Sequence, residues 1–140
     1  GLLPGSISEK VNPYLEPFFE SLYSCYDEEK VKKHIENTNI TGKALQFIRG
    51  NNFYDKSLNI LEEAQNSTKA EMLSFLTRLN KGARIVIVGD LDQQDTRESY
   101  TGLHYAIELA NKIQEIKHIK LKNNHRSDLV GKILDYEYER

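Results

Sequence analysis

Two apolar segments that end in acidic and amide side chains constrain the fold of this 140-residue chain more than any other feature. Residues 58–66 read LNILEEAQN, and residues 84–93 read RIVIVGDLDQ. Such an apolar run is typical of a strand buried in a parallel sheet, whose carboxyl end emerges at the sheet edge. Carboxylates at that edge can hold magnesium and orient water beside a phosphate. With a helix between the two strands, the sequence favours one nucleotide-type site.

Helical and strand patterns alternate along the rest of the chain. Ser6 and Thr68 each open a capping box with a glutamate three positions later, ahead of apolar residues at helical spacing. The helix that begins at Thr68 carries an apolar face made of Met72, Phe75, Leu76 and Leu79. We expect helices at 6–26, 27–35, 68–79, 99–112 and from 127, and strands at 44–49, 58–62, 84–89 and 116–121. This order predicts an α/β fold in which helices wrap a parallel sheet.

Composition limits the classes of partner. The formal charge is −2 at pH 7, so polyanion binding would need a local basic patch, and the longest basic stretch is residues 117–122. Cys25 is the single cysteine, which excludes an internal disulfide or a cysteine-based zinc site and indicates a reducing compartment. The sequence contains no signal peptide and no apolar run of membrane length, so we expect a cytoplasmic protein without membrane contact.

Several short blocks follow one another over almost the whole chain. They include GLLPG at 1–5, FIRG at 47–50, EEAQN at 62–66, GDLDQQD at 89–95 and TGLHYAIEL at 101–109. In this order the blocks resemble those of the PhoH-like (phosphate-starvation-inducible) ATPases. One short motif is weak evidence, whereas several in sequence are specific. The resemblance implies a RecA-like P-loop NTPase core, similar to superfamily 1 helicases, that uses ATP and Mg²⁺.

The resemblance gives Glu62 and Glu63 different roles. Glu62 stands where the family has a magnesium-associated aspartate, and we expect it to contact Mg²⁺ through water. Glu63 stands at the position of the carboxylate that orients the attacking water. Glutamate at position 62 is one methylene group longer than the family's aspartate. On the residues alone, the pair is equally compatible with two exposed acids that end a strand.

Four further residues complete the expected site. Gln93, in G-D-x-x-Q, matches the element that senses the γ-phosphate, and Asp90 in the same block is expected to contact the nucleotide. Arg126, in NNHRS, resembles the helicase N-Y-R-S element, and its planar charged fork suits a phosphoryl group that gains charge. Arg49 in the FIRG block is a candidate nucleic-acid contact. A structural ion pair would explain Arg49 equally well, and an exposed arginine at a helix start is the alternative for Arg126.

Residues 1–140 contain no phosphate-binding loop of the form G-x-x-x-x-G-K-[ST]. The resemblance implies such a loop upstream of GLLPG, so we expect residues 1–140 to be the carboxyl-terminal portion of a single NTPase domain that does not bind ATP tightly by itself. For the intact protein it implies Mg²⁺-dependent ATP hydrolysis coupled to RNA or single-stranded nucleic acid, and it allows a homo-oligomeric ring. A non-catalytic, degenerate interaction module and a receiver-like phosphoacceptor domain are the competing hypotheses.

Overall fold

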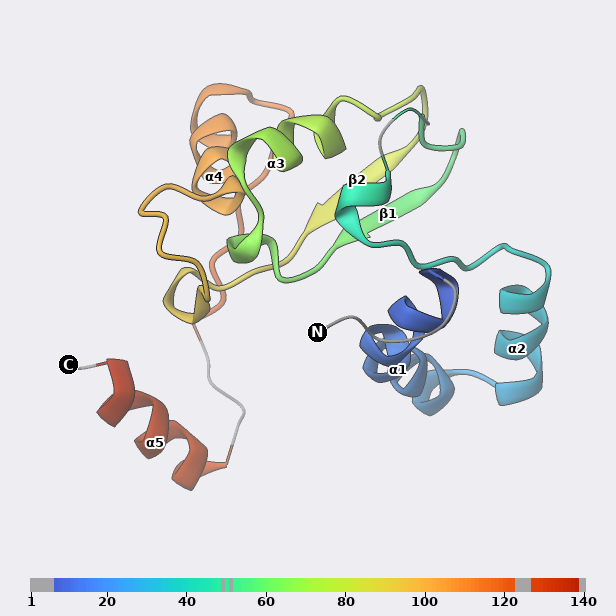
Figure 1. The fold of residues 1–140 in the computed structure, drawn as a ribbon, viewed down its shortest axis with the longest axis horizontal. Coiled ribbons are helices and arrows are strands. Elements are labelled where there is room, and N and C mark those ends of the chain that lie inside the picture. The colour runs from blue at the N-terminus through green and yellow to red at the C-terminus, as the bar shows by residue number, and fades with distance from the viewer. Residues whose placement is uncertain (1–6, 49, 51, 123–126, 139–140) are drawn as a thin grey trace. The chain divides into compact units, whose positions relative to one another are not determined.

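The structure is a computed structural model that describes the backbone of residues 7–48, 50, 52–122 and 127–138, and the side chains from residue 15 to residue 137 within those ranges. The chain divides into two compact units, residues 1–50 and residues 51–140. Its described part contains five α-helices and a two-stranded parallel sheet (Figure 1). None of these helices is long and apolar enough to cross a membrane.

The first unit contains α1 (Ile7–Cys25) and α2 (Glu28–Glu36), which confirms both predicted helices. Helix α2 begins where the side chain of Asp27 accepts a 3.0 Å hydrogen bond from the backbone N–H of Lys30. This contact satisfies one of the N–H groups that a helix start leaves without a partner. Val31 is buried in this unit. The capping box expected at Ser6 lies outside the described residues.

The predicted strand at 44–49 is wrong. A 3-10 helix, η1 (Leu45–Phe47), occupies this segment. The backbone N–H of Phe47 donates to the carbonyl of Ala44 at 2.9 Å, so the polar backbone groups are satisfied within the turn. A strand would need a neighbouring strand for the same groups, and the described sheet contains only residues of the second unit.

The second unit is built on two strands whose parallel pairing was predicted, β1 (Leu58–Leu61) and β2 (Arg84–Ile87). The expectation that these strands are buried is wrong along most of their length, because Leu58, Ile60 and Val86 are exposed and only Leu61 is buried. Leu61 pairs with Ile87, and the pairing continues past both strands because Val88 N–H donates to Leu61 O at 2.8 Å and Ala64 N–H donates to Val88 O at 3.0 Å. The carboxyl ends of the two strands therefore meet at one edge of the sheet (Figure 1). This edge carries the acidic and amide residues discussed below.

Helices α3 (Lys69–Leu76) and α4 (Gly102–Lys112) lie side by side in this unit (Figure 1). Helix α3 forms the crossover that joins β1 to β2, and its predicted capping box is confirmed by the contacts between Thr68 and Glu71. The buried apolar side chains of the unit are Leu61, Ala64, Met72, Phe75, Leu103 and Ala106. They fix the strand ends relative to the two helices.

Helix α3 ends earlier than predicted. Thr77 is its C-cap, and Leu79 lies beyond the helix with 51% of its surface exposed, so the prediction that Leu79 extends the apolar face is wrong. The N–H groups of Arg78 and Leu79 donate three residues back, to Phe75 and Leu76, which tightens the last turn and stops the α-helix. Helix α4 starts at Gly102 because Thr101 serves as its N-cap, three residues after the predicted start.

The predicted strand at 116–121 is also wrong. Residues 117–122 have no regular secondary structure, and Ile119 and Leu121 are exposed. A short segment with apolar residues forms a strand only where another strand accepts its backbone hydrogen bonds, and among the described residues β2 pairs with β1 alone. The last predicted helix is confirmed as α5 (Asp128–Tyr138).

Candidate functional site

The turn after β1 presents Glu62 and Glu63 differently. Both side chains are exposed, but Glu63 has a left-handed backbone, with φ 52° and ψ 38°. Such a conformation is uncommon for a residue with a β-carbon, and it is found where the surrounding structure holds it. Directly after Glu63, the chain enters the 3-10 helix η2 (Ala64–Asn66), in which Ala64 is fully buried. The chain therefore leaves the extended conformation of the strand at Glu63.

Gln65 lies beneath this turn with only 1% of its surface exposed. Its Nε2 donates to Oε2 of Glu63 at 2.6 Å and to the carbonyl of Gln93 at 3.4 Å. Its Oε1 accepts from the backbone N–H of Asp90 at 3.1 Å. One buried amide thus joins the residues after β1 to the residues after β2.

The segment after β2 is ordered by Asp90. One carboxylate oxygen of Asp90 accepts from the backbone N–H of Asp92 at 3.0 Å, and the other accepts from Nε2 of Gln93 at 2.9 Å. These contacts fold residues 91–93 into the 3-10 helix η3 (Leu91–Gln93). In this arrangement the amide group of Gln93 faces Asp90, which belongs to its own turn.

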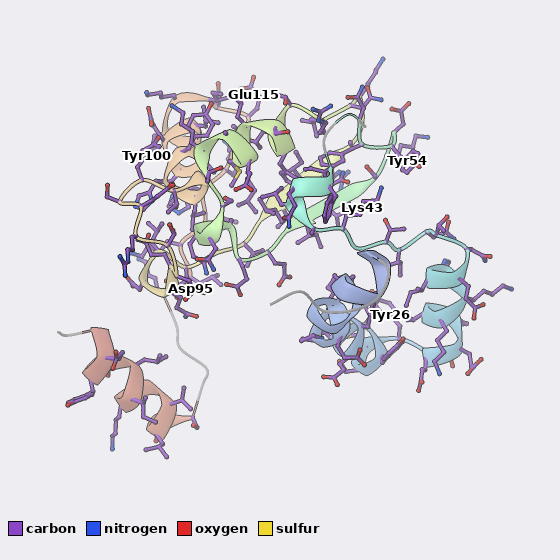
Figure 2. The ribbon with its side chains drawn as sticks, viewed as in Figure 1. Tyr26, Lys43, Tyr54, Asp95, Tyr100 and Glu115 are labelled. Atoms are coloured by element: carbon purple, nitrogen blue, oxygen red, sulfur yellow. The ribbon has the colours of Figure 1, made fainter. Side chains whose placement is uncertain are left out.

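A second amide connects the same two segments. Oδ1 of Asn66 accepts from the backbone N–H of Asp95 at 2.8 Å, and Nδ2 of Asn66 lies 3.5 Å from Oδ2 of Asp95. Asp95 lies just beyond η3 (Figure 2). Gln65 and Asn66 are adjacent in sequence, so the AQN part of the EEAQN block holds both ends of the acidic segment that follows β2.

The edge of the sheet is strongly acidic. Its carboxylates are Glu62, Glu63, Asp90, Asp92 and Asp95, and no described lysine or arginine forms an ion pair with any of them. Glu63, Asp92, Gln93 and Asp95 are among the residues that line an open depression there. The described side chains include no cluster of three or more residues arranged to hold a metal ion. Mg²⁺ does not require such a cluster, because it usually takes one or two protein carboxylates and completes its shell with water and phosphate oxygens.

The structure brings together four of the six residues that the sequence predicted for the site. Glu62, Glu63, Asp90 and Gln93 all lie at the carboxyl ends of β1 and β2. Arg126 and Arg49 lie outside the described residues. Sequence reasoning missed Gln65 and Asn66, which join the predicted residues to one another. An amide in a short turn gives no periodic signal, so the order E-E-A-Q-N was the only available indication.

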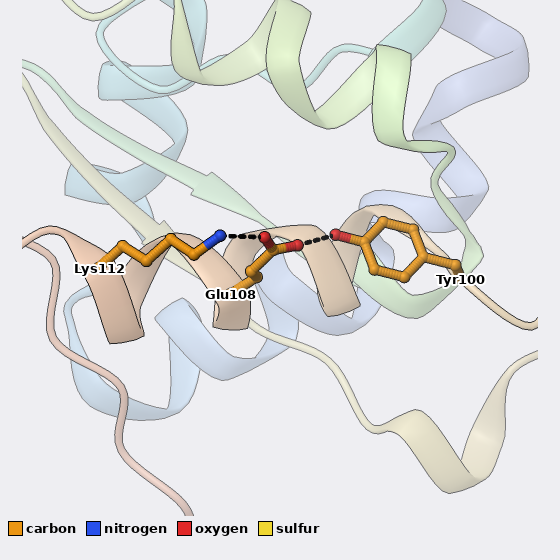
Figure 3. A network of polar contacts seen from close by, with 3 residues as sticks. All are labelled: Tyr100, Glu108 and Lys112. Carbon is orange, nitrogen blue, oxygen red and sulfur yellow. Dashed lines mark hydrogen bonds and ion pairs between the residues drawn. The ribbon is translucent and has the colours of Figure 1, made fainter.

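A polar network outside this edge was also missed. The hydroxyl of Tyr100 donates to Oε2 of Glu108, and Nζ of Lys112 donates to Oε1 of the same carboxylate (Figure 3). These hydrogen bonds, first from Lys112 and then from Tyr100, lower the pKa of Glu108. The hydrogen bond to Glu108, assisted by partial desolvation, raises the pKa of Tyr100 to about 12. The network connects the exposed side of α4 to Tyr100, which lies in the segment before the helix.

Parallel strands whose carboxyl ends gather polar side chains are typical of α/β proteins that bind ligands at that edge. Residues 1–138 match the family described as PhoH-like protein. A PhoH-like protein of Mycobacterium leprae is 37% identical over 99% of this chain and 41% of its own length, and one of Bacillus subtilis is 37% identical over 96% and 43%. Protein PhoH of Escherichia coli is 35% identical over 77% of this chain and 31% of its own length.

The chain belongs to the PhoH-like family, as the sequence blocks predicted. Family membership implies a P-loop NTPase fold, and members are generally ATP-binding proteins. The mixed α/β arrangement and the parallel pairing of β1 with β2 agree with that fold class. The chain spans about two fifths of the length of the Mycobacterium leprae and Bacillus subtilis relatives.

Proposed function

We propose that this chain carries the hydrolytic edge of a Mg²⁺-dependent ATPase. The observation that supports the proposal most directly is the Glu63 carboxylate, which a buried amide holds beside the Asp90–Gln93 segment, at the point where two parallel strands end. A carboxylate in a fixed orientation can accept a proton from a water molecule and orient that water toward a phosphoryl group. Glu63 is therefore assigned the role of orienting the attacking water.

The neighbouring residues receive complementary roles. The side chain of Glu62 is exposed and takes part in none of the hydrogen bonds found among the described side chains. Glu62 would contact Mg²⁺ through water. Asp90 and Gln93 would contact the nucleotide, with Gln93 exchanging its hydrogen bond to Asp90 for one to the γ-phosphate. Arg126 would stabilise the charge that develops on the transferred phosphoryl group. Mg²⁺ itself would neutralise phosphate charge when bound.

Coupling to a polymer belongs to the same proposal. Hydrolysis would be linked to RNA or single-stranded nucleic acid, with Arg49 as a candidate contact. Because the formal charge is −2, such binding must depend on a local basic surface and should weaken steeply with salt. A homo-oligomeric ring is one form in which the protein would act.

A non-catalytic interaction module is the second candidate. One observation favours it, because Nε2 of Gln93 is engaged by Asp90 and so is not aimed outward toward a ligand. The glutamate at position 62, in place of the family's aspartate, points in the same direction. Both features are compatible with a protein that has kept the fold and lost hydrolysis.

Calorimetric titration and phosphate release in the full-length protein separate the two candidates. The ATPase proposal predicts Mg²⁺-dependent ATP binding and hydrolysis that single-stranded RNA accelerates. ATP binding without hydrolysis, with or without RNA, would support the interaction module. An absence of ATP binding would contradict both the catalytic proposal and the assigned nucleotide contacts.

A further inference from the structure

We infer that Gln65 is a positioning residue that orients Glu63 and couples it to the segment at 90–93. The inference rests on the proposed function, because it gives Gln65 its role through the carboxylate assigned to the attacking water. Gln65 belongs to the EEAQN block, but the sequence alone assigned it no role. Its role follows from its burial and from the three hydrogen bonds of its amide group.

The amide of Gln65 has little freedom to move. Both of its N–H groups have acceptors, on Glu63 and on the carbonyl of Gln93, and its oxygen accepts from Asp90 N–H. If this buried amide lost its partners, its desolvation penalty would not be compensated by hydrogen bonds, so the native orientation is strongly preferred. Gly89 leaves room for this orientation, because a β-carbon there would lie 2.7 Å from Oε1 of Gln65. The donor that faces Glu63 is consequently fixed in direction.

Glu63 needs such a partner more than an ordinary surface glutamate does. Its side chain is exposed and would otherwise sample many rotamers, and its left-handed backbone is intrinsically unfavourable. The 2.6 Å hydrogen bond from Gln65 holds one carboxylate oxygen and leaves the other available. A carboxylate fixed in this way can meet water in one geometry, which is what efficient proton acceptance requires.

The amide of Gln65 also couples the position of the segment after β2 to the orientation of the Glu63 carboxylate. Because its oxygen holds Asp90 N–H and its nitrogen faces both Glu63 and Gln93, a shift of the segment after β2 must reorient the Glu63 carboxylate. A γ-phosphate that draws Gln93 away from Asp90 would therefore be sensed at Glu63 through Gln65. This gives the site a physical link between nucleotide contact and water activation.

The first test measures kcat and KM for ATP in the full-length protein with Gln65→Met. Methionine keeps the length and much of the volume of the side chain but removes all three hydrogen bonds. We expect kcat to fall by about ten- to a hundredfold, as for a misplaced catalytic group. KM should change less than about twofold, because the substitution removes no nucleotide contact. The control, Gln114→Met, replaces an exposed glutamine beyond α4 and should leave both parameters unchanged.

The second test uses Gln65→Glu, which keeps an oxygen acceptor for Asp90 N–H but replaces the donor that faces Glu63. At neutral pH the introduced carboxylate would repel Glu63 instead of holding it. We expect kcat to fall at least as far as in Gln65→Met, with KM again within about twofold of the wild type. Wild-type turnover in Gln65→Glu would overturn the inference, because Glu63 would then need no donor from position 65.

The third test reports the geometry without relying on hydrolysis. The amide proton of Asp90 should exchange faster in Gln65→Met and stay protected in Gln65→Glu, since glutamate retains an oxygen acceptor. If Gln65→Met fails to fold, kcat and KM of Gln65→Glu decide. Hydrolysis that survives Gln65→Met unchanged overturns this inference alone, whereas a wild-type protein that binds ATP but does not hydrolyse it overturns the proposed function as well.

Discussion

A β-carbon on Gly89 would lie 2.7 Å from Oε1 of Gln65, closer than such atoms approach one another in proteins. The same β-carbon would also crowd Leu103 and the backbone nitrogen of Ala64. We expect Gly89→Ala to destabilise the protein by about 1–3 kcal/mol, the usual range for overpacking. Denaturant unfolding measures the effect.

A double-mutant cycle identifies the cause of that loss. In a Gln65→Ala background the crowded oxygen is absent, so adding Gly89→Ala should cost clearly less than it does in the wild type. Equal costs in the two backgrounds would show that the contact with Gln65 is not what restricts position 89.

The capping box at the start of α3 gives a second prediction. Oγ1 of Thr68 accepts from Glu71 N–H at 3.2 Å, and a carboxylate oxygen of Glu71 accepts from Thr68 N–H at 2.8 Å. Thr68→Ala should lower the free energy of unfolding by about 1 kcal/mol. Thr77→Ala is the matched control, because its hydroxyl is exposed and donates to a carbonyl at the other end of the helix. If Thr77→Ala lowered the free energy of unfolding as much as Thr68→Ala does, the capping box would not be the cause of the loss.

Tyr100 gives a prediction about pH. Its pKa of about 12 means that the folded protein favours the neutral phenol, so its contribution to stability is complete below pH 10 and is lost as the pH rises through about 12. Glu108→Gln should bring the pKa of Tyr100 back toward its ordinary value, because it removes the accepting carboxylate. Ring NMR shifts of labelled tyrosine measure the titration, with Glu115→Gln as a control. An unchanged titration of Tyr100 in Glu108→Gln would contradict the network in Figure 3.

The sequence predicted the elements whose signals are local. The strands at 58–62 and 84–89 are rich in leucine, isoleucine and valine, and the helix that follows Thr68 is marked by a capping box that spans only four residues. Parallel pairing followed because a helix lies between the strands. Most of the predicted ends differ from the observed ones by one to three residues, since caps such as Thr101 decide where a helix begins.

The failures have one physical cause. Residues 44–49 and 116–121 are short segments that mix apolar and polar residues, but a strand exists only with a partner, and a short pattern does not specify one. For the site, the location of Glu62, Glu63 and Gln93 after the two strands was predictable. The contacts that join them were not, because the roles of Gln65 and Asn66 depend on which backbone groups lie opposite after folding.

Glu62 supports a prediction about magnesium. Its exposed side chain makes no described hydrogen bond, so shortening it should disturb nothing else. We expect Glu62→Asp to preserve or raise ATP turnover at an equal or lower half-saturating Mg²⁺ concentration. Turnover as a function of Mg²⁺ measures this, and Glu115→Asp serves as an exposed control. A clear loss of turnover in Glu62→Asp alone would contradict the metal role assigned to this position.

The turnover of Glu63→Gln in the full-length protein tests the central claim most directly. Glutamine keeps the shape of the side chain but cannot accept a proton from water. The account predicts that kcat falls about a hundredfold or more, while ATP affinity stays within about twofold of the wild type. Glu98→Gln, an exposed acid in the loop before α4, should behave like the wild type. Unchanged turnover in Glu63→Gln would contradict the account, because Glu63 would then be an exposed acid that ends a strand.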